Sequence, residues 1–161
     1  MVIVGCGCRG RALARELRTE GHAVRGTTRS EGRRADIEAA GAECYLGDPD
    51  RIGTLTYALD GATLLCWLLG SAQGSDAGVR ALHGTRLQML LERVIDTTVR
   101  GIVYEAAGTV DARVLEEGAA AVRHAHATSE IPYALIRGDP ADAAAWLADA
   151  RAAVGTLLSF A

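Results

Sequence analysis

The sequence predicts a three-layer α/β fold in which helices cover both faces of a parallel sheet of about six strands. Short apolar segments alternate with longer amphipathic segments along all 161 residues. A glycine-rich turn, Gly5 to Gly10, joins the first apolar segment to the first amphipathic one. This alternation is typical of consecutive βαβ units, and a chain of this length is about one domain. We therefore expect residues 1–161 to form a single domain.

The first part of the chain contains four expected strands: Val2–Val4, His22–Thr28, Ala42–Leu46 and Ala62–Leu68. Three expected helices lie between them: Gly10 to Glu20, Glu31 to Ala40, and one that opens at Asp48-Pro49-Asp50. In the first of these helices Leu13 and Leu17 are four residues apart, which places both on the face that would pack on the sheet. Gly21 and Gly41 follow the first two helices, and glycine commonly ends a helix.

The second part begins with a loop rich in glycine and serine, 70–78, and a long helical segment over 79–97 that Gly84 is expected to bend. The remaining expected elements are a strand at Gly101–Ala106, a helix at Ala112–Thr128, a strand at Pro132–Arg137 and a helix from Asp139-Pro140 to about Val154. Connections between parallel strands are right-handed. The expected strand order is 3-2-1-4-5-6, which is the order of the Rossmann fold.

Composition limits the classes of function. The net charge is −3, which disfavours a nucleic-acid or anionic-membrane partner because both need a basic face. The first expected strand begins at Val2, which leaves no room for a signal peptide. The longest apolar run, 62–69, is too short to span a bilayer. We therefore expect a cytoplasmic protein with no nucleic-acid or membrane partner.

All 17 basic residues are arginine, so the chain has no lysine. Arginine keeps its proton in proteins, which excludes any mechanism that needs a catalytic lysine from this chain. The four cysteines lack the spacing of zinc or thiol–disulfide sites, and we expect no metal site. Cys6 and Cys8 are interpreted as small residues in a tight loop, and Cys44 and Cys66 as buried strand residues.

The loop Gly5-Cys6-Gly7-Cys8-Arg9-Gly10 matches the GxGxxG pattern of dinucleotide-binding sites, with an expected strand before it and a helix after it. Gly5 permits the tight turn, Gly7 lets the backbone approach a pyrophosphate, and Gly10 lets the helix pack close to the strand. The amides that open the helix, including those of Cys8 and Arg9, would face the phosphate charge. The alternative is a glycine-rich turn without a ligand.

The end of the second expected strand distinguishes NADP from NAD. NAD enzymes place Asp or Glu there to bind the ribose hydroxyls, whereas this chain has Thr28-Arg29-Ser30. A guanidinium and hydroxyl donors suit a 2′-phosphate. Further positive charge could come from adjoining loops through Arg9, Arg33 and Arg34. The sequence favours NADP, and NAD is the alternative if Glu31 reaches the ribose.

Two more residues belong to the expected cofactor site. Asp48 follows the third expected strand, where the adenine would lie, and its carboxylate can accept from the adenine amino group. A compatible alternative is that Asp48 caps the next helix. Leu68 ends the fourth expected strand, at the sheet edge that the cofactor would cross.

Four segments carry a resemblance to a known superfamily: VIVGCGCRG, RGTTR, AECYLGDPDRIGTLTYAL and IPYALIR. They resemble the atypical and extended short-chain dehydrogenases/reductases, particularly the NmrA-like and the epimerase/dehydratase-like branches. The resemblance covers nearly the whole chain and implies an NAD(P)-binding Rossmann domain. Active members of the superfamily place Ser or Thr after strand five and Tyr-x-x-x-Lys on the next helix. Here the fifth strand ends Glu105-Ala106-Ala107-Gly108, and the helix at 112–128 has neither tyrosine nor lysine.

We therefore assign no catalytic residue. His83 and Glu105 lie near the expected cofactor edge and are alternatives for a proton donor, whereas Trp67 and Tyr104 are interpreted as core residues. The leading hypothesis is a nucleotide-binding sensor or regulatory protein, as the NmrA-like resemblance implies. The alternative is a small NADPH-dependent oxidoreductase that passes hydride directly to a flavin-like or quinone-like acceptor. A third hypothesis is a subunit completed by another copy or a protein partner, with the apolar tail 157–160 as the docking segment.

Overall fold

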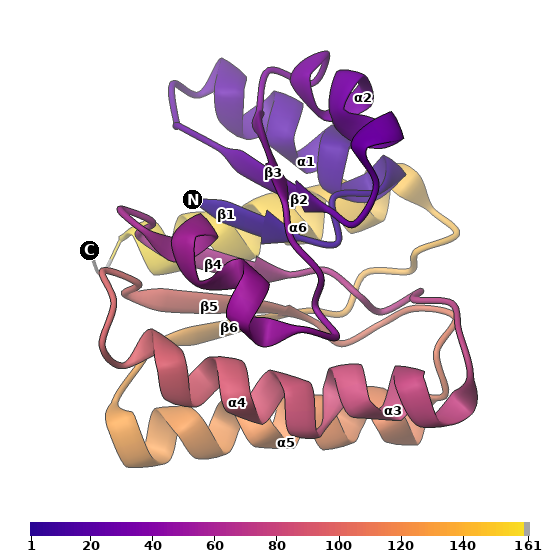
Figure 1. Ribbon diagram of the computed structural model, residues 1–161, viewed down its shortest axis with the longest axis vertical. Coiled ribbons are helices and arrows are strands. Elements are labelled where there is room, and N and C mark those ends of the chain that lie inside the picture. Colours follow the sequence, from indigo (N-terminus) through magenta and orange to yellow (C-terminus); the bar gives the residue numbers. More distant parts are fainter. Residues whose placement is uncertain (160–161) are drawn as a thin grey trace.

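The sheet organises the molecule into three layers (Figure 1). The structure is a computed structural model and describes residues 1–159. Over these residues the strands are β1 (Val2–Val4), β2 (Arg25–Thr28), β3 (Glu43–Leu46), β4 (Leu64–Trp67), β5 (Gly101–Glu105) and β6 (Tyr133–Ile136). They form one parallel sheet in the order β3-β2-β1-β4-β5-β6. The predicted fold class and strand order are confirmed.

Helices cover both faces of this sheet. They are α1 (Cys8–Thr19), η1 (Glu31–Arg33), α2 (Arg34–Glu38), η2 (Ile52–Leu59), α3 (Asp76–His83), α4 (Thr85–Val94), α5 (Ala112–Ser129) and α6 (Ala143–Leu158). One face packs against α1, α2 and α6, and the other packs against η2, α4 and α5. In Figure 1, α3, α4 and α5 lie together on one side of the sheet, and α1 and α6 lie on the opposite side.

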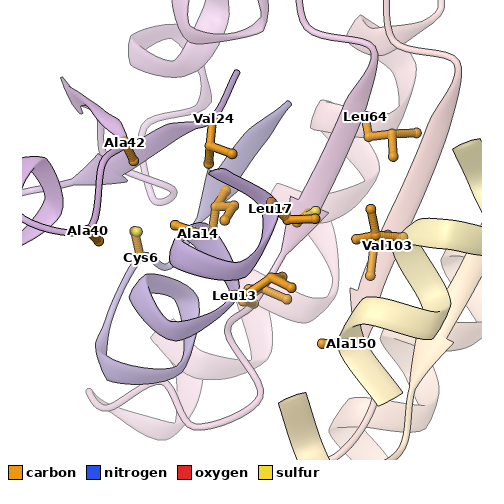
Figure 2. Packing of buried hydrophobic residues seen from close by; sticks show 14 of the residues in the cluster. Cys6, Leu13, Ala14, Leu17, Val24, Ala40, Ala42, Leu64, Val103 and Ala150 are labelled. Atoms are coloured by element: carbon orange, nitrogen blue, oxygen red, sulfur yellow. The ribbon is translucent and has the colours of Figure 1, made fainter. Parts of the chain in front are cut away.

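Successive residues of the central strands enter opposite cores because side chains alternate along a strand. In β4, Leu64 and Cys66 pack toward α1 and α6, whereas Leu65 and Trp67 pack toward η2 and α4. Figure 2 shows the first of these cores, with the apolar stripe of α1 facing the strands. Trp67 is fully buried, as expected. The uniformly apolar sequence of β4 therefore reflects burial on both faces, which is typical of a central parallel strand.

Several boundaries differ from the sequence prediction, and local contacts explain most of them. The segment 70–78 is not all loop, because Ser75 caps α3 by accepting from the Gly78 amide at 3.2 Å. Gly84 (φ −112°, ψ −105°) separates α3 from α4 instead of only bending one helix. The third expected helix is the 3₁₀ helix η2. The last helix begins at Ala143, because Asp142 accepts from its first amides.

Two residues of the proposed docking segment 157–160 pack inside this molecule. Leu157 is buried and Leu158 packs against the same core, because α6 extends to Leu158 and turns both side chains toward the sheet. They are therefore not available as a docking segment. Phe160, the last apolar residue of that segment, lies outside the described residues. Across residues 1–159, none of the helices has the length and apolar character needed to cross a membrane.

Candidate functional site

A cavity of about 550 Å³ lies at the carboxyl edge of the sheet. Its wall comes from the β1–α1 turn, the ends of β2 and β3, the β4–α3 loop and the start of α3. These segments meet between β1 and β4, where the strand order reverses and where open α/β sheets bind their ligands. All the expected cofactor residues line this cavity except Ser30 and Asp48.

The glycine-rich turn forms the floor of the cavity. Gly5 has φ +85°, and a Cβ there would lie 2.3 Å from the Leu68 carbonyl oxygen, so only glycine fits. A Cβ at Gly10 would lie 3.0 Å from the Gly5 carbonyl oxygen, which shows how closely α1 approaches β1. Gly7 differs from both because nothing lies within 4 Å of an added Cβ. The backbone is therefore open to a ligand at Gly7.

The N-terminus of α1 suits an anion. Its N-cap residue, Gly7, offers no side-chain acceptor, and the first turn contains no acidic residue. The first amides of a helix have no partner within the helix and carry partial positive charge. Four arginines also line the cavity: Arg9, Arg11, Arg29 and Arg33. Geometry and charge at this point fit the phosphate groups of a nucleotide.

The end of β2 supplies a second cationic region. Thr28, Arg29 and Arg33 all line the cavity. Arg29 is 62% exposed, and its guanidinium lies 3.7 Å from the Asp50 carboxylate, so it is only loosely paired. Ser30 lies beside this region, where its amide donates to the Thr28 hydroxyl at 3.1 Å.

Glu31, the acid that would favour NAD over NADP, lies outside the cavity wall. Glu31 pairs with Arg34, and this hydrogen bond lowers the pKa of the Glu31 carboxyl. Neither residue lines the cavity. Arg34 therefore neutralises Glu31 and does not add charge to the site.

Asp48 stabilises a turn. Its carboxylate accepts from the Asp50 amide at 3.1 Å, and its own amide donates to the Thr54 hydroxyl at 2.8 Å. The N-cap of η2 is Arg51, three residues later, so Asp48 does not cap that helix. Pro49 and Asp50 line the cavity where Asp48 was expected.

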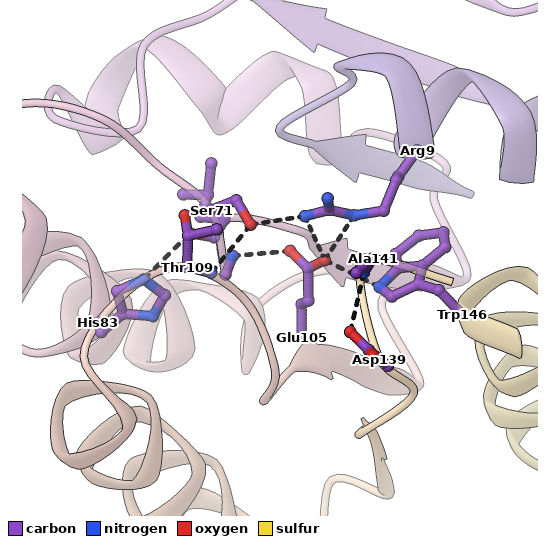
Figure 3. A network of polar contacts seen from close by, with 10 residues as sticks. Arg9, Ser71, His83, Glu105, Thr109, Asp139, Ala141 and Trp146 are labelled. Atoms are coloured by element: carbon purple, nitrogen blue, oxygen red, sulfur yellow. Dashed lines mark hydrogen bonds and ion pairs between the residues drawn. The ribbon is translucent and has the colours of Figure 1, made fainter. Parts of the chain in front are cut away.

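Glu105 is the centre of a polar network that the sequence did not indicate (Figure 3). It lies at the end of β5 and is 1% exposed. Its Oε1 accepts from the Arg9 guanidinium at 3.0 Å and from the Trp146 indole at 2.9 Å, and its Oε2 accepts from the Gly70 amide at 2.7 Å. Arg9 also donates to the Ser71 hydroxyl at 2.8 Å and lies over the Trp146 ring.

All contacts of Glu105 are donated to its carboxylate, so it serves as an acceptor and ion-pair partner and not as a proton donor. A buried carboxylate requires a hydrogen-bonding or charged partner. This requirement was the only indication in the sequence that Glu105 would be paired. The partner could not be identified from it, because Arg9 lies 96 residues away along the chain.

His83 belongs to the core and not to the cavity wall. It is fully buried, with Nδ1 2.7 Å from the Tyr104 hydroxyl and Nε2 3.2 Å from the Leu69 carbonyl oxygen. Burial lowers the pKa of His83 and raises the pKa of Tyr104. The Tyr104 hydroxyl also donates to the Leu115 carbonyl at 3.1 Å. These contacts tie α3 to β5 and α5.

The four cysteines are free thiols. Cys8 is exposed and lines the cavity, whereas the other three are buried. Burial raises the pKa of Cys6 to about 11 and that of Cys66 to about 12. No cluster of three metal-ligating side chains occurs in the part of the chain that the structure describes.

No protein-family model and no curated protein matches the sequence. Solved structures do match. The triphenylmethane reductase of Citrobacter sp. complexed with NADP(H) is similar over 85% of this chain, at TM-score 0.64 and 18% identity. The UDP-glucuronic acid 4-epimerase from Bacillus cereus in complex with NAD is similar over 84%, at 0.70 and 14%. A short-chain dehydrogenase/reductase superfamily protein from Agrobacterium tumefaciens with bound NAD is similar over 84%, at 0.69 and 18%.

These matches cover 48%, 54% and 48% of the solved chains, so this chain spans about half their length. At these identities the similarity is one of fold. The resemblance to extended short-chain dehydrogenases/reductases that the sequence suggested is confirmed at that level.

Proposed function

We propose that the cavity binds NADP(H) and that the protein acts as a nucleotide sensor or regulatory protein. The observation that carries this proposal is the uncapped N-terminus of α1 beside Gly7, where a ligand can approach the backbone and arginines surround the space. Similar folds hold NADP(H) in triphenylmethane reductase and NAD in the Bacillus cereus epimerase. NAD is the alternative cofactor.

Different groups of lining residues would contact different parts of the nucleotide. The amides of residues 8–10 would hold the pyrophosphate, whereas the Gly7 amide, also expected to do so, donates to the Gly5 carbonyl at 2.7 Å. Thr28, Arg29 and Arg33 would hold the 2′-phosphate, since a guanidinium and a hydroxyl both donate to phosphate oxygens. The adenine would lie beside Pro49 and Asp50.

The lack of the Tyr-x-x-x-Lys pair that the resembling superfamily uses supports a binding role. The chain has no lysine, and Ala106-Ala107-Gly108 follows β5. The two candidates for proton transfer, His83 and Glu105, are both held in internal hydrogen bonds. The similarity to triphenylmethane reductase favours one alternative, an NADPH-dependent reductase that passes hydride directly to an acceptor.

Calorimetric titration with NADPH and NADH, followed by an oxidation assay, tests this proposal. We expect NADPH to bind more tightly than NADH. We also expect its absorbance at saturating protein to decay no faster with flavin or quinone acceptors than in a mixture without protein. Acceptor-dependent oxidation of NADPH would favour the reductase hypothesis over the sensor hypothesis. If neither nucleotide binds at millimolar concentration, the proposed function is wrong.

Arg29→Ala should weaken NADPH binding and leave NADH binding nearly unchanged. A hydrogen bond to a charged group contributes about 1.5–3 kcal/mol, or roughly tenfold to a hundredfold in affinity. The exposure of Arg29 places the effect near the lower end, and added salt should reduce it. Thr28→Asp combined with Arg29→Ala should reverse the preference, because a carboxylate repels phosphate and accepts from ribose hydroxyls.

Arg113→Ala is the matched control, because Arg113 is an exposed arginine outside the cavity. It should leave both affinities unchanged. Equal loss of NADPH and NADH binding in Arg29→Ala would mean that Arg29 is structural, and the assignment of NADP would fall.

A further inference from the structure

The two halves of the sheet differ at their carboxyl edges. The edge of β1, β2, β3 and β4 opens into the cavity, whereas Glu105 at the end of β5 is the last residue in sequence that does so among those described. A Rossmann sheet consists of two mononucleotide-binding halves. The half that would take the nicotinamide mononucleotide therefore lines the cavity with the end of β4, the β4–α3 segment and Glu105, and the loop after β5 and the end of β6 contribute nothing to the wall.

Backbone contacts join the loop after β5 to the loop after β4. The Val110 amide donates to the Gly70 carbonyl at 3.0 Å, and the Thr109 amide donates to the Ser71 hydroxyl at 3.2 Å. A Cβ at Gly108 would lie 1.7 Å from the Gly70 carbonyl oxygen, and a Cβ at Gly70 would lie 2.3 Å from the Ala107 carbonyl oxygen. The loop after β5 thus packs directly on the loop after β4, with no room between them for a ring.

Arg9, Ser71, Glu105 and Trp146 form a group that we call the Arg9 clasp (Figure 3). The clasp connects α1 to the end of β5 and to the loop after β4. The Arg9 side chain is 29% exposed, whereas that of Glu105 is 1% exposed. Withdrawing the guanidinium would leave a buried carboxylate without its cation, which is strongly unfavourable. The clasp is therefore a stable barrier.

We propose that this site takes the class of 2′-phosphorylated adenosine diphosphates, and that the nicotinamide riboside of NADP(H) contributes little to binding. The inference rests on the proposed function and deepens it. A protein that holds only the 2′-phosphoadenosine diphosphate part binds the oxidised and the reduced cofactor alike. It therefore responds to the total amount of NADP(H) and not to the ratio of the two forms.

Calorimetric titration with four ligands tests this inference: NADP⁺, NADPH, 2′-phospho-ADP-ribose and nicotinamide mononucleotide. We expect the first three dissociation constants to agree within about tenfold, which corresponds to a difference of about 1.4 kcal/mol. We expect no heat from nicotinamide mononucleotide. If 2′-phospho-ADP-ribose binds more than about tenfold more weakly than both dinucleotides, or NADP⁺ and NADPH differ by more than that factor, the inference is wrong.

Those results would leave the proposed NADP(H) binding intact, so the two failures are distinguishable. Binding of 2′-phospho-ADP-ribose without binding of either dinucleotide would remove the proposed function and support the closed second half. If none of the four ligands binds, both proposals fall.

Tryptophan fluorescence supplies a second measurement within the same protein. In Trp67→Phe the emission comes from Trp146, whose indole donates to Glu105 and contacts Arg9. The buried Trp67 indole nitrogen has no partner in the described chain, so this replacement removes no hydrogen bond. Saturating NADP⁺ and saturating 2′-phospho-ADP-ribose should give the same emission. A change with NADP⁺ alone would place the nicotinamide against the clasp and overturn the inference.

Discussion

Gly7→Val should abolish nucleotide binding while the protein stays folded. Gly7 has φ −74° and ψ −156°, a conformation that other residues adopt, and nothing lies within 4 Å of an added Cβ. The valine would therefore occupy the open space through which a pyrophosphate approaches the α1 amides. Loss of two charge-assisted hydrogen bonds would cost about 3–6 kcal/mol, which weakens binding by about a hundredfold or more. Titration with NADPH measures the loss, and thermal unfolding measures the stability.

Gly53→Val is the matched control. Gly53 is an exposed glycine in η2 that also has open space around it, and it lies outside the cavity. This variant adds the same side chain and should bind NADPH as the unmodified protein does. Wild-type affinity in Gly7→Val would show that the nucleotide does not lie on this turn. Loss of the cooperative unfolding transition in Gly7→Val would show that the space around an added Cβ at Gly7 is not open.

Gly118→Ala should destabilise the protein strongly. Gly118 is buried in α5, where an added Cβ would lie 2.0 Å from the Tyr104 hydroxyl and 2.6 Å from the ring carbon that carries it. Tyr104 cannot move easily, because its hydroxyl contacts both His83 and the Leu115 carbonyl. Overpacking of this kind costs about 3 kcal/mol. In a domain of this size that corresponds to a fall in Tm of roughly 6–12 °C.

The control for this variant is Gly155→Ala in α6, an exposed helical glycine with nothing within 4 Å of an added Cβ. It should stabilise the protein by about 0.5–1 kcal/mol, since alanine loses less backbone entropy in a helix. Adding Tyr104→Phe to Gly118→Ala removes the hydroxyl that the new methyl group meets. The double variant should therefore be more stable than the sum of the single effects predicts. Strict additivity would show that the two residues do not collide.

The order of elements follows from the sequence because local patterns carry it. Four uniformly apolar positions, 64–67, form the central strand β4, and Leu13 and Leu17 form the buried stripe of α1. Helix boundaries were predicted less well where one side chain decides them. Ser75 and Asp142 each start a helix by accepting from backbone amides, and many serines and aspartates in loops do not do so.

The cavity was predicted in part for the same reason. The turn from Gly5 to Gly10 joins β1 to α1, and Thr28-Arg29 stands at the end of β2, so the local pattern is enough to predict that both line the carboxyl edge of the sheet. The partner of Glu31 was not predicted, because a helix-surface contact with Arg34 and an approach to the cavity are equally compatible with the sequence.

The sequence by itself determined that this chain forms a parallel Rossmann sheet, carries a glycine-rich turn after its first strand and has no lysine for catalysis. Only the tertiary structure decided what happens at the edge of β4 and β5. There Glu105 meets Arg9, Gly70 and Trp146, which come from three other parts of the chain. A buried carboxylate must be paired when the chain folds. Which cation approaches it depends on how α1, α6 and the β4–α3 loop pack over the sheet, and no local pattern in the sequence contains that information.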